Sequence, residues 1–169
     1  SKYIQSEMGT AYIEAKEELS KGKFVIFTGT PCQIAGLKTF LGKEYDNLLC
    51  VDLVCHGVPS GDVLEHYFVD NESKSKSIEG IDFRYKKCQN GKWESKYAVL
   101  HYNTGKKKIV DYDSSGFLRG FACGLFFRPS CSTCPFACQE RVSDLTIGDA
   151  WGIEKSKPLL NPHQGVSLI

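Results

Sequence analysis

The chain has 169 residues, of which 41% are hydrophobic and 24% are charged, so it can bury a substantial apolar core in the manner of ordinary globular proteins. The net charge of +1 gives no electrostatic basis for binding nucleic acid or an acidic membrane. No apolar run approaches the length of a membrane span, and no signal peptide is visible.

The first half of the chain predicts a βαβ unit. A helix is expected over residues 3–20, followed by a strand over Phe24–Thr28. The segment TPCQIAGLKTFLG predicts a second helix, with Thr30 as the N-cap, Pro31 in the first turn and Gly42 after the last residue. The next strand, Leu48–Val54, is almost continuously apolar, which is typical of a parallel strand covered on both faces.

The pattern then changes from alternating strands and helices to hairpins. A helix capped by Ser60 is expected in PSGDVLEHYFVDN, and strand-like segments joined by turns follow between Ile78 and Tyr112. A short helix in FLRGFACGLFF precedes a cysteine-rich loop, and SDLTIGDAWG reads as a strand running into a turn. We therefore predict a single domain over residues 1–169 with a mixed α/β (α+β) fold: a parallel βαβ core, added antiparallel hairpins and a cysteine-rich loop.

Eight cysteines are many for a chain of this length. Because the chain also has good core segments, unlike small disulfide-rich domains, we favour a reduced, cytoplasmic protein with a thiolate site. The segment CSTCPFAC places Cys131 and Cys134 at a C-x-x-C spacing, which suits zinc, an iron–sulfur cluster or a redox disulfide. Two further ligands must then come from elsewhere in the chain.

Cys32 and Cys55 are the candidates for those two ligands. Each follows the carboxyl end of one of two neighbouring parallel strands, where open α/β sheets place their functional sites. Cys32 also falls in the first turn of its helix, where backbone N–H groups and the helix dipole stabilise a thiolate. The remaining cysteines have simpler explanations: Cys50 and Cys123 suit the core, and Cys138 suits either packing or ligation. His56, next to Cys55, is a hydrogen-bonded loop residue or a zinc ligand.

Five motifs in this order resemble the coenzyme F420 hydrogenase/dehydrogenase beta subunit family, specifically its carboxy-terminal domain. They are SKYIQS, FTGTPCQIAGLKTFLG, DLVCHGVPS, RPSCSTCPFA and RVSDLTIGDAWGI. The resemblance implies an iron–sulfur flavoprotein in which electrons pass between a 4Fe–4S cluster and a hydride carrier, such as a deazaflavin, through bound FAD. By motif, the cluster ligands would be Cys32, Cys55, Cys131 and Cys134. Residues expected near the flavin or its surroundings are Gly29, Thr30, Gln33, His56, Asp149 and Trp151.

The resemblance also implies a redox partner. Many relatives carry a ferredoxin-like segment with two clusters, and its cysteine pattern does not occur in this sequence. Since the chain begins at Ser1 and reads as an excerpt, we expect that segment upstream or a separate partner protein, and no nucleic acid. Two other functions remain open from the residues alone. They are a zinc-stabilised binding domain with the same four cysteines, and a thiol–disulfide protein that uses Cys131 and Cys134.

Overall fold

The computed structural model describes residues 3–89, 92–150, 152–156 and 166–169. They fold into two compact units: unit 1 comprises Ser1–Ser6 and Gly57–Thr133, and unit 2 comprises Glu7–His56 and Cys134–Ile169. Unit 2 holds a sheet with parallel strands and unit 1 an antiparallel sheet, each with helices, which confirms the predicted mixed α+β fold. A single domain over residues 1–169 stays a prediction, because the units are defined only by their internal packing.

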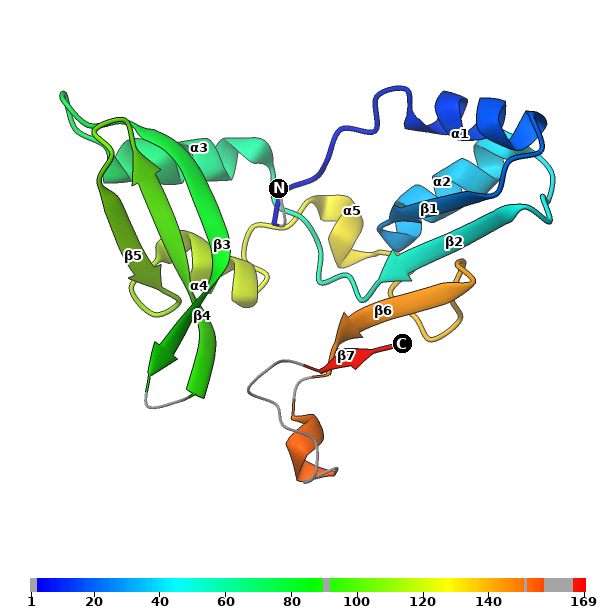
Figure 1. Cartoon of the computed structure of the whole chain (residues 1–169). Coiled ribbons are helices and arrows are strands. Elements are labelled where there is room, and N and C mark those ends of the chain that lie inside the picture. The colour runs from blue at the N-terminus through cyan, green and yellow to red at the C-terminus, as the bar shows by residue number, and fades with distance from the viewer. Residues whose placement is uncertain (1–2, 90–91, 151, 157–165) are drawn as a thin grey trace. The chain divides into compact units, whose positions relative to one another are not determined.

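Unit 2 is built on a sheet with the strand order β1-β2-β6-β7 (Figure 1). Strands β1 (Val25–Gly29), β2 (Leu48–Leu53) and β6 (Leu145–Asp149) are parallel, and β7 (Ser167–Leu168) pairs antiparallel with β6. The predicted parallel pairing of the first two strands is confirmed. A short 3-10 helix, η1 (Ile153–Lys155), follows β6.

Helices α1 (Ala11–Ser20) and α2 (Pro31–Leu41) cover one face of this sheet. The core between them contains residues from both helices and from the first two strands: Ala15, Leu19, Phe27, Ile34, Leu37, Leu41 and Cys50. On the opposite face, Ile26 is 60% exposed and Leu53 is 41% exposed. Among the described residues, helices thus cover one face of the sheet, and coverage of both faces of β2 stays a prediction, because Leu49 and Val51 on the other face are half-buried.

The start of α2 follows the predicted capping pattern. Thr30 is the N-cap in extended conformation and Pro31 is the first helical residue, where its missing N–H costs nothing. At the other end, Gly42 adopts a φ of 68°, the left-handed conformation that favours glycine after a helix. In contrast, α1 begins only at Ala11, and Tyr3 lies in the core of unit 1. The apolar residues Tyr3 and Ile4 thus reflect burial in unit 1, not a helix.

Unit 1 combines an antiparallel sheet of order β3-β4-β5 with three helices (Figure 1). Its strands are β3 (Ile78–Gln89), β4 (Lys92–Tyr102) and β5 (Lys107–Asp111). Its helices are α3 (Gly61–Asn71), α4 (Gly116–Ala122) and α5 (Pro129–Ser132). The core contains Leu64 of α3, Leu100 of β4 and Leu118 of α4, so the predicted hairpins and helices pack on each other. Among the helices that the structure describes, none combines the length and apolar character needed to cross a bilayer.

Candidate functional site

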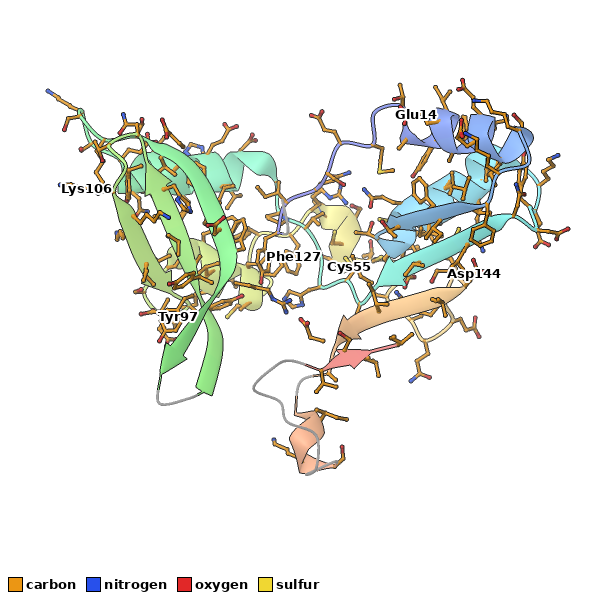
Figure 2. All side chains as sticks on the ribbon, in the orientation of Figure 1. Glu14, Cys55, Tyr97, Lys106, Phe127 and Asp144 are labelled. Carbon is orange, nitrogen blue, oxygen red and sulfur yellow. The ribbon has the colours of Figure 1, made fainter. Side chains whose placement is uncertain are left out.

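Three candidate residues lie at one edge of the sheet of unit 2, where its parallel strands end. Gly29 at the end of β1 pairs with Asp52 of β2, and Leu53 at the end of β2 pairs with Ile147 of β6. Cys32, Cys55 and Asp149 therefore follow or occupy the carboxyl ends of three adjacent strands (Figures 1 and 2). This confirms the position expected for Cys32 and Cys55.

Cys32 lies in the first turn of α2 and is exposed. Its Sγ atom is in hydrogen-bonding contact with the hydroxyl of Thr30, 3.1 Å away. Burial raises the pKa of the neighbouring Tyr12, and the charge at Cys32 raises it further. Cys32 is thus a solvent-accessible thiol in the first turn of α2.

Gln33 completes the start of the same helix. Its Oε1 atom accepts a hydrogen bond of 2.9 Å from the backbone N–H of Thr30, and its carbonyl accepts one of 2.7 Å from the hydroxyl of Tyr12. A Cβ atom on Gly29 would lie 3.1 Å from that Oε1 atom. The Gln33 side chain therefore lies beside Gly29, and the flavin contacts predicted for Gly29, Thr30 and Gln33 stay predictions.

The other residues expected near a flavin follow or occupy the ends of β2 and β6. Cys55 is half-buried and His56 is exposed, and they come directly after β2. Asp149 is the last residue of β6 and its side chain is exposed. Trp151 lies outside the described residues. The flavin contacts predicted for these positions stay predictions.

The loop from Cys134 to Glu140 carries two cysteines of unit 2. Cys134 is half-buried, and its carbonyl accepts a hydrogen bond of 3.3 Å from the N–H of Ala137. Cys138 is exposed, and its thiol donates to the carbonyl of Glu140 over 3.1 Å. Cys134 thus begins a tight turn, whereas Cys138 is engaged with the backbone of its own loop.

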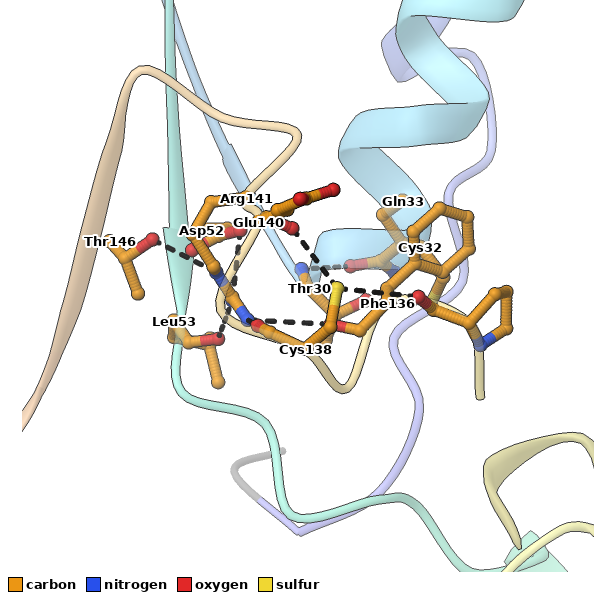
Figure 3. A network of polar contacts seen from close by, with 11 residues as sticks. Thr30, Cys32, Gln33, Asp52, Leu53, Phe136, Cys138, Glu140, Arg141 and Thr146 are labelled. Carbon is orange, nitrogen blue, oxygen red and sulfur yellow. Dashed lines mark hydrogen bonds and ion pairs between the residues drawn. The ribbon is translucent and has the colours of Figure 1, made fainter. Parts of the chain in front are cut away.

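Arg141 joins this loop to the sheet (Figure 3). Its guanidinium forms an ion pair with a carboxylate of β2, two hydrogen bonds to carbonyls of the loop, one to the carbonyl of the last residue of β2 and one to a hydroxyl of β6. The partners are Asp52, Phe136, Cys138, Leu53 and Thr146. The loop and the carboxyl end of β2 are therefore held by one side chain.

Asp52 is the buried partner of Arg141. Its side chain has no exposed surface, and its Oδ2 atom lies 3.0 Å from Nη2 of Arg141. Burial by itself would raise the pKa of Asp52, but polar groups of Thr146, Arg141 and Ser143 and the positive charge of Arg141 outweigh it and lower that pKa. Asp52 is thus held as a carboxylate in the interior.

Cys131 belongs to unit 1, where it lies half-buried in the short helix α5. The start of α5 is held by a bridge between Pro59 and Phe127 and by a hydrogen bond of 3.0 Å from the N–H of Arg128 to the carbonyl of Val58. The N–H of Cys131 in turn donates to the carbonyl of Arg128 over 2.8 Å. Cys131 is therefore fixed to the segment that follows His56 in the chain.

The donor chemistry of these cysteines suits a metal–thiolate centre. None of the seven cysteines whose side chains the structure describes forms a disulfide, and Cys32, Cys55, Cys131 and Cys134 all retain some solvent access. Thiolates are the usual ligands of iron–sulfur clusters. Within the described residues, no three His, Cys, Asp or Glu side chains are grouped closely enough to hold a metal ion. The four cysteines thus have the donor chemistry that an iron–sulfur cluster needs. Their arrangement around one cluster stays a prediction.

The burial of two cysteines and one buried ion pair can be compared with the sequence predictions. Cys50 is fully buried, as predicted, but Cys123 caps the end of α4 and is exposed, so its assignment to the core was wrong. Cys123 follows the last residue of α4 and lies outside its buried face, which is formed by Phe117, Leu118 and Phe121. Asp52 and Arg141 were not singled out, although a single acid inside the apolar run NLLCVDLVC is a signal that it has a buried partner.

Comparison with known proteins identifies the family of the chain. No curated protein matches the chain. A family model does match, over residues 22–169, and it describes the C terminus of the beta subunit of coenzyme F420 hydrogenase/dehydrogenase. The match spans β1 and β2, which precede Cys32 and Cys55, and continues through the cysteine-rich loop to Arg141 and β6. The chain therefore belongs to the family of C-terminal domains of the coenzyme F420 hydrogenase/dehydrogenase beta subunit, which are parts of oxidoreductase enzymes.

Proposed function

We propose that this domain is an electron-transfer module that binds a 4Fe–4S cluster through Cys32, Cys55, Cys131 and Cys134 and works with FAD. When bound, the cluster would supply one-electron transfer and the flavin hydride transfer. The acceptor or donor of the hydride is proposed to be a deazaflavin such as coenzyme F420, named by the family, or a related carrier. A protein partner follows from the family, whose members are subunits of larger enzymes.

The observation that carries this proposal is the position of Cys32 and Cys55 at the same edge of a parallel sheet. The pairing of β1 with β2 brings their carboxyl ends together, and each cysteine follows one of those ends. Cys134 begins the loop that Arg141 ties to the end of β2. Three of the four proposed ligands therefore belong to one end of one compact unit.

The residues of the chain would contribute in distinct ways. The first turn of α2 favours the thiolate of Cys32, which is the form that ligates iron. Cys131 and Cys134 are close in sequence, so they can approach one metal centre from a single turn. The thiol state of the described cysteines suits a reducing compartment, and we propose a cytoplasmic location.

The test is anaerobic purification of the full chain, followed by a visible spectrum and assays of iron, sulfide, zinc and flavin. About four iron and four sulfide per chain, with broad brown absorbance, would support the proposed cluster. About one zinc in a colourless protein would instead support a structural zinc site with the same cysteines. Protein without metal, in which only Cys131 and Cys134 respond to thiol oxidation, would indicate thiol–disulfide chemistry.

A further inference from the structure

We propose that Arg141 is a positioning residue that sets the geometry of the Cys134 and Cys55 thiolates. The inference rests on the proposed function, because it gives these two cysteines the role of ligands. The hydrogen bonds of Arg141 go to backbone carbonyls and a hydroxyl rather than to either thiol. Its role would be to hold the two backbone segments that carry them.

The contacts of Arg141 involve all three nitrogens of its guanidinium. A guanidinium has five N–H groups: one on Nε and two on each Nη atom. Here Nε donates to the Thr146 hydroxyl over 3.1 Å. The Nη1 atom donates to the carbonyls of Phe136 over 3.4 Å and Cys138 over 3.3 Å. The Nη2 atom donates to the carbonyl of Leu53 over 3.2 Å and pairs with Asp52. The side chain therefore makes four hydrogen bonds and one ion pair, which together reach the loop, β2 and β6.

The backbone acceptors lie next to the proposed ligands in the chain. Phe136 and Cys138 follow Cys134 within one loop, and Leu53 precedes Cys55 at the end of β2. In Figure 3 the guanidinium lies between that loop and the strand, with dashed contacts running to both sides. A displacement of Arg141 would therefore shift the approach of both cysteines at once.

Asp52 explains why the guanidinium keeps one orientation. Its carboxylate is fully buried, and the side chain of Arg141 is 23% exposed, so neither group can move into water without losing the pair. A partly dehydrated planar cation with a fixed counter-charge has one favoured orientation. The remaining N–H groups are then directed at the loop and at Leu53.

A lysine at position 141 cannot reproduce this arrangement. It keeps the positive charge, but it has three donors on a single nitrogen and no planar fork. Arg141→Lys is therefore the informative variant. It retains the pairing with Asp52 while removing most contacts to the carbonyls of Leu53, Phe136 and Cys138. Arg119→Lys is the matched control, because Arg119 is exposed on α4 in unit 1.

The first test measures amide hydrogen exchange in the metal-free full chain. In Arg141→Lys, peptides covering residues 134–142 should exchange at least about tenfold faster than in the wild type, and in Arg119→Lys they should not change. A second control, Leu37→Ala, lowers the stability of unit 2 by removing a fully buried side chain of α2 that has no hydrogen bond to the loop. Unchanged exchange of the loop in Arg141→Lys, or an equal increase in Leu37→Ala at matched overall stability, would overturn the proposal.

The second test follows the cluster after anaerobic reconstitution, with electron paramagnetic resonance recorded after reduction by dithionite, because the oxidised 4Fe–4S cluster gives no signal. Arg141→Lys should lose iron to a chelator about tenfold faster than the wild type and show a changed electron paramagnetic resonance spectrum, whereas both controls should keep the wild-type spectrum. An unchanged spectrum and rate would overturn the role in ligand geometry. If the wild type itself binds no iron, the proposed function fails and this role fails with it. The exchange experiment then still decides whether Arg141 orders the loop.

Discussion

The Asp52 carboxylate lies 3.0 Å from the Arg141 guanidinium and is completely shielded from solvent. Breaking such a pair leaves an uncompensated charge in the interior. Asp52→Asn should therefore lower the free energy of unfolding by about 3 kcal/mol, because Arg141 stays partly buried without its counter-charge. Urea unfolding of the metal-free chain measures this loss. Asp46→Asn, at an exposed position, should change the same free energy by less than about 0.5 kcal/mol. A small effect of Asp52→Asn would show that the pair contributes little.

The same pair predicts a dependence of stability on pH. The pKa of Asp52 is lower in the folded chain than its ordinary value of about 4, so the folded state favours the carboxylate. Its contribution is complete above the unfolded pKa and is lost as the pH falls through the folded pKa. The stability difference between the wild type and Asp52→Asn should thus stay constant from pH 7 down to about pH 5 and shrink below about pH 4. A difference that is independent of pH down to acid unfolding would contradict this assignment.

Gly57 lies against Phe127 in a conformation that other residues rarely adopt. Its φ is 117°, and a Cβ atom there would lie 2.6 Å from a ring carbon of Phe127. Gly57→Ala should destabilise unit 1 by about 3 kcal/mol through strain and overpacking. Gly61→Ala is the control, because a Cβ atom at Gly61 meets nothing and the residue is helical. Thermal unfolding should show a clearly lower midpoint temperature for Gly57→Ala and an unchanged one for Gly61→Ala. Equal midpoint temperatures in the two variants would refute the described contact.

The proposed ligands can be separated from the other cysteines by substitution. Cys32→Ser, Cys55→Ser, Cys131→Ser and Cys134→Ser should each abolish most cluster binding, because every one removes an iron ligand. Cys123→Ser and Cys138→Ser should retain it, since neither residue belongs to the proposed ligand set and the Cys138 thiol donates to carbonyls of its own loop. Iron and sulfide content after anaerobic reconstitution provides the measurement. Loss of iron in Cys138→Ser but not in Cys134→Ser would reassign the ligand.

Gln33 should stabilise the start of α2, because its side chain accepts a hydrogen bond from the backbone N–H of Thr30. Gln33→Ala removes the acceptor for the Thr30 N–H and should cost about 1 kcal/mol of unfolding free energy. Gln33→Glu keeps a side-chain oxygen at that place and should restore most of the loss. Denaturant unfolding of the metal-free chain tests this. Equal destabilisation by both variants would mean that the amide group, and not merely its oxygen, is needed.

Much of the fold followed from local patterns in the sequence. The cap at Thr30, the proline after it and the glycine that ends α2 act on adjacent backbone groups, so they could be identified without tertiary contacts. The alternation between β1, α2 and β2 predicted their parallel pairing because short crossovers through a helix leave few other arrangements. The same logic placed Cys32 and Cys55 at one sheet edge.

Local patterns failed where distant parts of the chain determine burial. The apolar spacing near Tyr3 resembled a helix, but Tyr3 is buried by residues far along the chain in unit 1. Cys123 sits among apolar neighbours, yet the end of α4 leaves it exposed. In both cases the burial of the side chain depends on segments that are distant in the sequence, so the neighbouring residues do not predict it.

By itself, the sequence determined the order and type of most elements, the caps of α2 and the cysteines that belong to the family pattern. These features depend on residues within a turn or two of each other. Only the tertiary structure paired Asp52 with Arg141 and directed the remaining N–H groups of that arginine at Leu53 and the Cys134 loop. The two residues are far apart in the sequence, and they meet only when the whole unit has folded. No local pattern therefore specifies this pair.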